Sequence, residues 1–161
     1  PDVFVDAVRQ VPGVRAEMFG DGVARGSVAA AAADLPERRL TVHGPVPQSR
    51  VLEAMRGAHV LVSTSLDFDN QPMVILEGIA SGLPVIVADA DLAEMLPDGG
   101  GLVTPTPDAA GLAASLAALR DSPERVTAMS EAAIAHREHV AQNTHRDALL
   151  DIYRAALASA R

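Results

Sequence analysis

Short apolar runs alternate with segments of helical spacing along the whole chain of 161 residues. The apolar runs predict strands at residues 14–19, 39–42, 58–63, 85–88 and 102–103. Helices are predicted at residues 23–33, 48–56, 73–81, 108–119, 122–138 and 143–160. Strands that are separated by helices are typical of βαβ units, in which neighbouring strands run parallel. The order of elements therefore predicts one α/β domain over residues 1–161, with a Rossmann-like, doubly wound parallel sheet and helices on both of its faces.

The chain opens on residues 1–10, which have helical spacing but follow no strand. We expect that the first strand of the sheet and the loop after it are missing, so that the domain is truncated at its N-terminus. The alternative is a free N-terminal helix.

The charge balance is acidic and includes no lysine. All 13 strongly basic residues are arginine, against 21 acidic residues, which gives a formal net charge of −8. A phosphate backbone or an anionic membrane would repel such a chain on average, so neither nucleic acid nor a membrane is an expected partner. The chain also has no lysine for Schiff-base chemistry or for a P-loop.

The absence of cysteine excludes disulfides and thiolate catalysis, and it is consistent with a cytoplasmic location. No apolar run reaches the length of about 18 residues that a membrane span requires. Apolar residues make up 48 % of the chain but aromatic residues only 2 %, so we expect an aliphatic core. The many alanines and arginines indicate a GC-rich, bacterial source.

The segment 63–88 combines a strand end, a polar loop and a helix start. The strand that ends at Ser63 is followed by a loop with Asp69, and a helix begins at Met73. The N-terminus of a helix presents unpaired N–H groups and a positive dipole end, which favour an anion such as a pyrophosphate. Glu77 lies about one turn into this helix, and a carboxylate there can accept hydrogen bonds from the vicinal hydroxyls of a ribose.

One spacing in this segment matches a known family. Asp69 is followed by seven residues, then by Glu77, a small-residue helix and Gly82-Leu83-Pro84-Val85. This resembles the C-terminal, nucleotide-sugar-binding half of the family 4 (group 1) retaining glycosyltransferases of GT-B fold, with their pattern of Glu, seven residues, Glu and then Gly-x-Pro-Val. Further matches are Gly20-Asp21-Gly22, His43-Gly44-Pro45-Val46, Glu94 with Gly99-Gly100-Gly101-Leu102-Val103, and Asp151-Ile152-Tyr153. The resemblance spans nearly the whole chain.

The resemblance implies a role for each matching residue. Glu77 would hold the ribose hydroxyls of the donor, and Asp69 would be the catalytic residue at the hexose. Asn70 and Gln71 would meet the hexose through their N–H groups. The other implied contacts are Met73 and Val74 to the diphosphate, Val42 and His43 to the base, mostly through main chain, and Gly20 to the nucleotide.

The chain also departs from the family's pattern. Asp69 is one methylene shorter than the family's glutamate, and Asn70-Gln71-Pro72 replaces the family's Gly-Phe-Gly. Pro72 has no N–H to offer to the sugar. The arginine and lysine with which the family holds the pyrophosphate are not in this chain, and we expect the chain to begin just past them.

The implied activity is transfer of a hexose, with retention, from a nucleotide-diphosphate sugar to an acceptor. The family needs no protein-bound metal or other cofactor, and its acceptor site lies in an N-terminal domain, so we expect residues 1–161 alone to be inactive. Membrane attachment at the inner face would depend on that absent domain. A mannose donor carried by GDP is a guess for a bacterial chain of this composition.

Two other functions stay open. Another GT-B enzyme, such as an epimerase or a phosphorylase, would place different residues beside the phosphates, and the spacing from Asp69 to Glu77 does not favour it. A non-catalytic α/β interaction module would have no nucleotide affinity and would tolerate a change of Glu77.

The singled-out residues also have purely structural interpretations. These are a helix cap for Asp69, a solvated helix position for Glu77, turn positions for Gly20 and Gly22, a strand end for His43, and a plain surface position for Glu94. We expect His136, His139 and His145 to lie on a solvated helix face. Without cysteine or a tight carboxylate set beside them, no metal site is expected.

Overall fold

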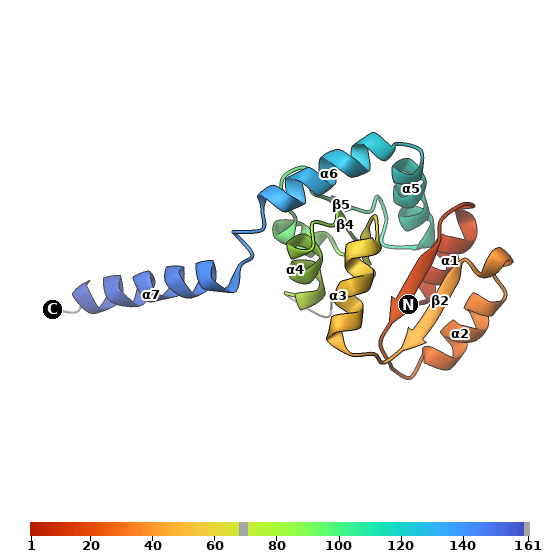
Figure 1. Ribbon diagram of the computed structural model, residues 1–161, viewed down its shortest axis with the longest axis horizontal. Coiled ribbons are helices and arrows are strands. Elements are labelled where there is room, and N and C mark those ends of the chain that lie inside the picture. The colour runs from red at the N-terminus through yellow and green to blue at the C-terminus, as the bar shows by residue number, and fades with distance from the viewer. Residues whose placement is uncertain (68–70, 160–161) are drawn as a thin grey trace.

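Five parallel strands form the centre of the protein in a computed structural model that describes residues 1–67 and 71–159 (Figure 1). They are β1 (Ala16–Phe19), β2 (Leu40–Gly44), β3 (Leu61–Ser63), β4 (Val85–Val87) and β5 (Gly101–Val103). One sheet has the order β1-β2 and the other the order β3-β4-β5, and every pairing is parallel. The parallel strands and the helices between them confirm the predicted α/β, Rossmann-like fold. The prediction of a further strand before residue 1 is not tested.

Seven α-helices and two short 3₁₀ turns are seen in the described residues. The helices are α1 (Asp2–Gln10), α2 (Arg25–Ala33), α3 (Gln48–Gly57), α4 (Met73–Ala80), α5 (Ala109–Arg120), α6 (Pro123–Ala135) and α7 (Gln142–Ser159). The 3₁₀ turns are η1 (Pro36–Arg38) and η2 (Ala90–Met95), and neither was predicted. The strand predicted at residues 58–63 is shorter than expected. Ala58 instead ends α3, with its N–H donated to the carbonyl of Met55, so pairing begins only at Leu61.

Strand β4 shows why the helices lie on both faces. Its three side chains are fully buried, as expected for a strand inside a parallel sheet that is covered on both sides. Ile86 belongs to a cluster with Leu112 of α5, whereas Val85 and Val87 pack in a second cluster with Ile75 of α4. Alternate side chains of one strand therefore anchor helices on opposite faces.

Helix α1 is part of the packed domain. Val5 and Val8 are buried in a cluster with Val28 of α2, and Ala7 packs with residues of α5. The buried guanidinium of Arg39 donates hydrogen bonds to the carbonyls of Val8 and Val11, at 2.9 and 2.7 Å, close to the C-terminus of α1. Each of these carbonyls also accepts a backbone N–H at 3.4 Å, from Val11 and Val14 respectively, so the cation adds a shorter, charged hydrogen bond at the negative end of the helix.

Helix α7 extends away from the rest of the molecule (Figure 1). None of its described residues is buried. Its large apolar side chains are exposed at Leu149, Leu150, Ile152, Tyr153 and Leu157. Within residues 1–67 and 71–159, no helix combines the length and the apolar character that crossing a membrane requires.

Candidate functional site

Most of the predicted ligand-binding residues follow the carboxyl ends of β1, β2 and β3. In sheets of this kind, ligands bind in the crevice outside these ends. Gly20 follows β1, Val42 and His43 lie at the end of β2, and Met73 begins the helix that follows β3. One contact links the segments after β2 and β3. The side-chain amide of Gln48, at the start of α3, donates a hydrogen bond of 2.6 Å to Oε1 of Glu77 on α4.

Gly20 is at a turn that requires glycine. Its φ of 117° lies in a region that other residues rarely adopt, and its N–H donates a hydrogen bond of 2.9 Å to the carbonyl of Gly44. A Cβ at Gly20 would meet no atom within 4 Å. The turn is thus fixed by its backbone, and the space beside Gly20 is open.

His43 stacks on an aromatic ring at the end of β1. The ring centroids of His43 and Phe19 are 4.6 Å apart and the rings are within 4° of parallel. Nε2 of His43 lies 3.6 Å from a carboxylate oxygen of Glu17. Neither partner was predicted, because the strand register between β1 and β2 shifts between Met18 and Phe19. The side chain of Val42 packs against the apolar cluster that includes Val28 of α2. Only the main chain of Val42 is therefore available to a ligand at the strand end.

Arg25 brings a cation to the same strand ends. Its guanidinium lies 3.2 Å from Asp21 and 3.5 Å from where a Cβ of Gly44 would be. The backbone N–H of Gly22 and the guanidinium of Arg25 both hold the pKa of Asp21 below its ordinary value. Sequence reasoning did not single out Arg25, since its closeness to β2 arises only when α2 is placed beside that strand.

Glu77 is half-buried on α4 and is held by Gln48, so it is not a freely solvated helix residue. The next residue, Gly78, fixes how closely α4 approaches β3. A Cβ on Gly78 would come within 2.5 Å of a terminal methyl of Leu61. The small residue thus lets the Glu77 backbone lie close to the sheet.

The N-terminus of α4 has a proline at its cap position. Pro72 occupies the position before the helix and makes no side-chain hydrogen bond to cap it, and the first turn has no acidic residue. Met73 and Val74 are exposed there. The N–H of Ile75 donates to the carbonyl of Pro72 at 3.0 Å, and the positive dipole end of the helix at Met73 and Val74 favours an anion.

The loop between β3 and α4 is described only in part. Asp69 and Asn70 lie outside the described residues, and Gln71 is exposed. Asp67, for which the sequence suggested no role, adopts a φ of 51° and donates its N–H to Oδ2 of Asp89 at 2.9 Å. Asp89 also accepts the N–H of Asp91, at the start of η2. Asp89 therefore ties the loop after β3 to the turn after β4, a role that sequence reasoning missed.

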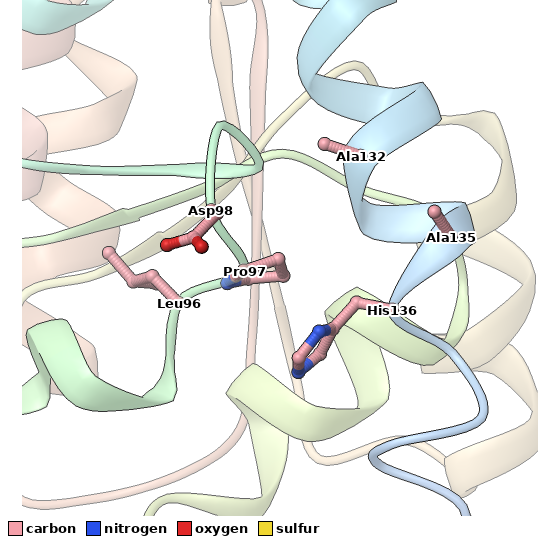
Figure 2. A pocket seen from close by; sticks show the side chains of 6 residues that line it. All are labelled: Leu96, Pro97, Asp98, Ala132, Ala135 and His136. Atoms are coloured by element: carbon pink, nitrogen blue, oxygen red, sulfur yellow. The ribbon is translucent and has the colours of Figure 1, made fainter.

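A separate hollow lies between the segment before β5 and the end of α6 (Figure 2). It is lined by Leu96, Pro97, Asp98, Ala132, Ala135 and His136. None of these is a predicted ligand-binding residue. His136 stacks on His139, with ring centroids 4.6 Å apart. Across residues 1–67 and 71–159, no group of three or more His, Cys, Asp or Glu side chains is arranged to hold a metal ion.

Solved structures share this fold and define its class. The protein is similar to Anabaena Alr3699/HepE in complex with UDP, with a TM-score of 0.76 and 20 % identity over 92 % of this chain and 44 % of that one. It is also similar to sucrose-phosphate synthase from Thermosynechococcus elongatus, with a TM-score of 0.80 and 22 % identity over 98 % of this chain and 42 % of that one. These likenesses place the fold with that of the GT-B glycosyltransferases.

The sequence comparisons show the family. Residues 1–122 match the family described as "Glycosyl transferases group 1". The chain is 35 % identical, over 121 residues, to the D-inositol 3-phosphate glycosyltransferase of Streptomyces griseus subsp. griseus, a match that covers 74 % of this chain. The chain therefore belongs to the group 1 glycosyl transferases, as its C-terminal domain motifs predicted. It spans a quarter of the length of that relative.

Proposed function

We propose that residues 1–161 form the donor-binding half of a retaining hexosyltransferase that uses a nucleotide-diphosphate sugar. The observation that carries the proposal is the placement of Glu77. Glu77 is a half-buried residue on the helix that follows β3, and its carboxylate accepts a hydrogen bond from Gln48. The family supports transfer of a glycosyl group from a nucleotide sugar. The similar HepE structures are complexes of that protein with UDP and with UDP-glucose.

Each part of the donor has a proposed partner. The two ribose hydroxyls donate hydrogen bonds to Glu77, because a carboxylate can accept from both at once. The diphosphate lies at the N-terminus of α4, beside Met73 and Val74, where N–H groups and the helix dipole favour negative charge. The base lies beside the main chain of Val42 and His43 at the end of β2, near the turn at Gly20.

The hexose site is proposed from the sequence. Asp69 and the N–H groups of Asn70 and Gln71 would hold the sugar, although the first two lie outside the described residues. In the transfer, the bond between the anomeric carbon and the diphosphate breaks with its electron pair on the diphosphate, and a bond to the acceptor hydroxyl oxygen forms on the same face. The hydroxyl proton passes to the leaving diphosphate. The N-terminus of α4 stabilises the negative charge that the leaving diphosphate gains. We propose no metal or other cofactor for this step.

The acceptor site is proposed to lie in a domain outside residues 1–161. The chain covers only 42–44 % of the similar HepE and sucrose-phosphate synthase chains. We therefore expect the 161-residue chain to bind the donor without transferring its sugar.

Ligand-observed NMR tests the proposal. UDP, GDP and ADP, and their sugar conjugates, are titrated against the wild-type chain and the Glu77→Ala variant. We expect one nucleotide to bind to the wild type. In Glu77→Ala, the ribose protons of that nucleotide should no longer show an NMR signal of contact with the protein. The matched control is Glu131→Ala, which removes the same charge from an exposed position on α6.

Two results would contradict this function. If no nucleotide binds to the folded chain, or if Glu77→Ala binds as well as the wild type, the donor site is not where we place it. An interaction module without nucleotide affinity predicts the first of these results.

A further inference from the structure

The contact between Gln48 and Glu77 joins residues that are 29 positions apart in the sequence. Gln48 is the first residue of α3, which begins immediately after Pro47 and shortly after β2. Glu77 is on α4, which follows β3. The hydrogen bond therefore spans from the segment after one strand to the segment after the next, at 2.6 Å between Nε2 and Oε1.

The chemistry of the two side chains fixes the direction of this hydrogen bond. An ionised carboxylate only accepts, so the amide must present its NH₂ group to Glu77. The recorded contact uses Oε1 alone. Both lone pairs of Oε2 and the second lone pair of Oε1 remain available to accept hydrogen bonds. The carboxylate thus retains enough acceptor positions for two vicinal hydroxyls.

We propose that Gln48 is a positioning residue for ribose recognition, which acts by holding the Glu77 carboxylate in the orientation that accepts both hydroxyls. This inference rests on the proposed function of Glu77. A glutamate side chain has several rotatable bonds, and fixing them in advance lowers the entropy that binding would otherwise cost. An amide does this without neutralising the carboxylate, which keeps the negative charge that strengthens hydrogen bonds from the hydroxyls.

The test compares ribonucleotides with nucleotides that lack both hydroxyls. The probes are UDP, GDP and ADP and their 2′,3′-dideoxy counterparts, titrated by calorimetry against the wild-type chain, Gln48→Ala and Gln48→Glu. Ser49→Ala is the matched control, because it changes the adjacent exposed residue of the same helix turn. Thermal unfolding of each variant establishes that it is folded.

We expect Gln48→Ala to weaken binding of the ribonucleotide by about 3- to 10-fold, the size of one typical net hydrogen bond, because Gln48 acts only through Glu77. Binding of the dideoxy counterpart should change by less than about 2-fold, because that ligand makes no use of the Glu77 orientation. Gln48→Glu should weaken ribonucleotide binding further, since a like charge then faces Glu77. In a Glu77→Ala background, Gln48→Ala should have no additional effect.

The outcomes separate this inference from the function on which it rests. An equal loss for both ligands would show that Gln48 only supports the local structure, and no loss would show that it does not position Glu77. Either result overturns the inference about Gln48. The proposed function still stands if Glu77→Ala strongly weakens binding of the nucleotide. If Glu77→Ala itself binds normally, or if no nucleotide binds to the wild type, both are wrong.

Discussion

The imidazole of His43 lies parallel to the ring of Phe19, with 4.6 Å between the ring centroids and 4° between the planes. The pair joins the carboxyl ends of β1 and β2, where we place the nucleotide base. Parallel stacking of this kind contributes about 0.5–1.5 kcal/mol beyond the burial of the rings.

Replacing Phe19 with leucine should lower the free energy of unfolding by about 1 kcal/mol, because the apolar volume is largely kept while the stack is lost. Urea unfolding measures this value. The same substitution in a His43→Ala background should have a clearly smaller effect. Equal effects in both backgrounds would mean that the two rings do not interact.

Removal of the buried guanidinium of Arg39 should destabilise the protein by about 2–4 kcal/mol. Arg39→Met fills much of the same volume but removes the charged donor of the Val8 and Val11 carbonyls, which keep only backbone hydrogen bonds of 3.4 Å. The unfolding free energy of Arg39→Lys should lie between those of the wild type and Arg39→Met, because one ammonium group cannot reproduce the planar fork of a guanidinium. Arg15→Ala, at an exposed position, is the control and should change the unfolding free energy little in the same denaturation experiment.

Two helical glycines should respond to alanine with opposite signs. At Gly111 the new Cβ would overlap the backbone oxygen and nitrogen of Thr106, so Gly111→Ala should destabilise by about 1–3 kcal/mol. At Gly26 of α2 a Cβ would meet nothing within 4 Å, so Gly26→Ala should stabilise by about 0.5–1 kcal/mol. Thermal unfolding of the two variants should show shifts in opposite directions.

The N-terminus of α5 should make stability dependent on pH. The N–H of Gly111, followed by the hydroxyl of Thr106, holds the pKa of Asp108 below its ordinary value of 3.8. A lowered pKa in the folded state means that the stabilisation is present above 3.8 and is lost as the pH falls through the folded-state pKa.

Asp108→Asn keeps an oxygen that can cap the helix but removes the titration. We therefore expect the wild type to lose stability relative to this variant as the pH falls below 3.8. Melting temperatures recorded across that range provide the comparison. Parallel curves for the two proteins would show that Asp108 is not stabilised by the fold.

The periodicity of the sequence was sufficient to predict the α/β fold, but not the local register. Short strands such as β4 could be located because their apolar runs lie between helical segments and glycine or proline. The stack between Phe19 and His43 could not, because it depends on the register shift in β1–β2, which no side-chain pattern encodes. The expected length of β3 was wrong for a similar reason, since only the hydrogen bond of Ala58 shows where α3 ends.

The residues of the candidate site could be predicted from the sequence, but the residues that contact them could not. Glu77 was found from its spacing to Asp69, whereas Gln48 was missed because an exposed glutamine at a helix start has no distinctive sequence signal. Asp89 was missed too, since its contact with Asp67 joins residues that are 22 positions apart. The first contact joins the segments after β2 and β3, which belong to different sheets, and the second joins the segments after the paired strands β3 and β4. Both form only once the chain is folded.

The burial of β4 on both faces also limits where this protein can vary in length. Because alternate side chains of a strand face opposite ways, insertion or deletion of one residue within β4 would turn Ile86 away from α5 and toward α4. The loop after β1 is exposed at Asp21, Gly22 and Val23, where a change of length does not reverse the faces of a strand. A version of this protein redesigned for another donor would therefore keep β4 residue for residue and change its loops at the carboxyl edge.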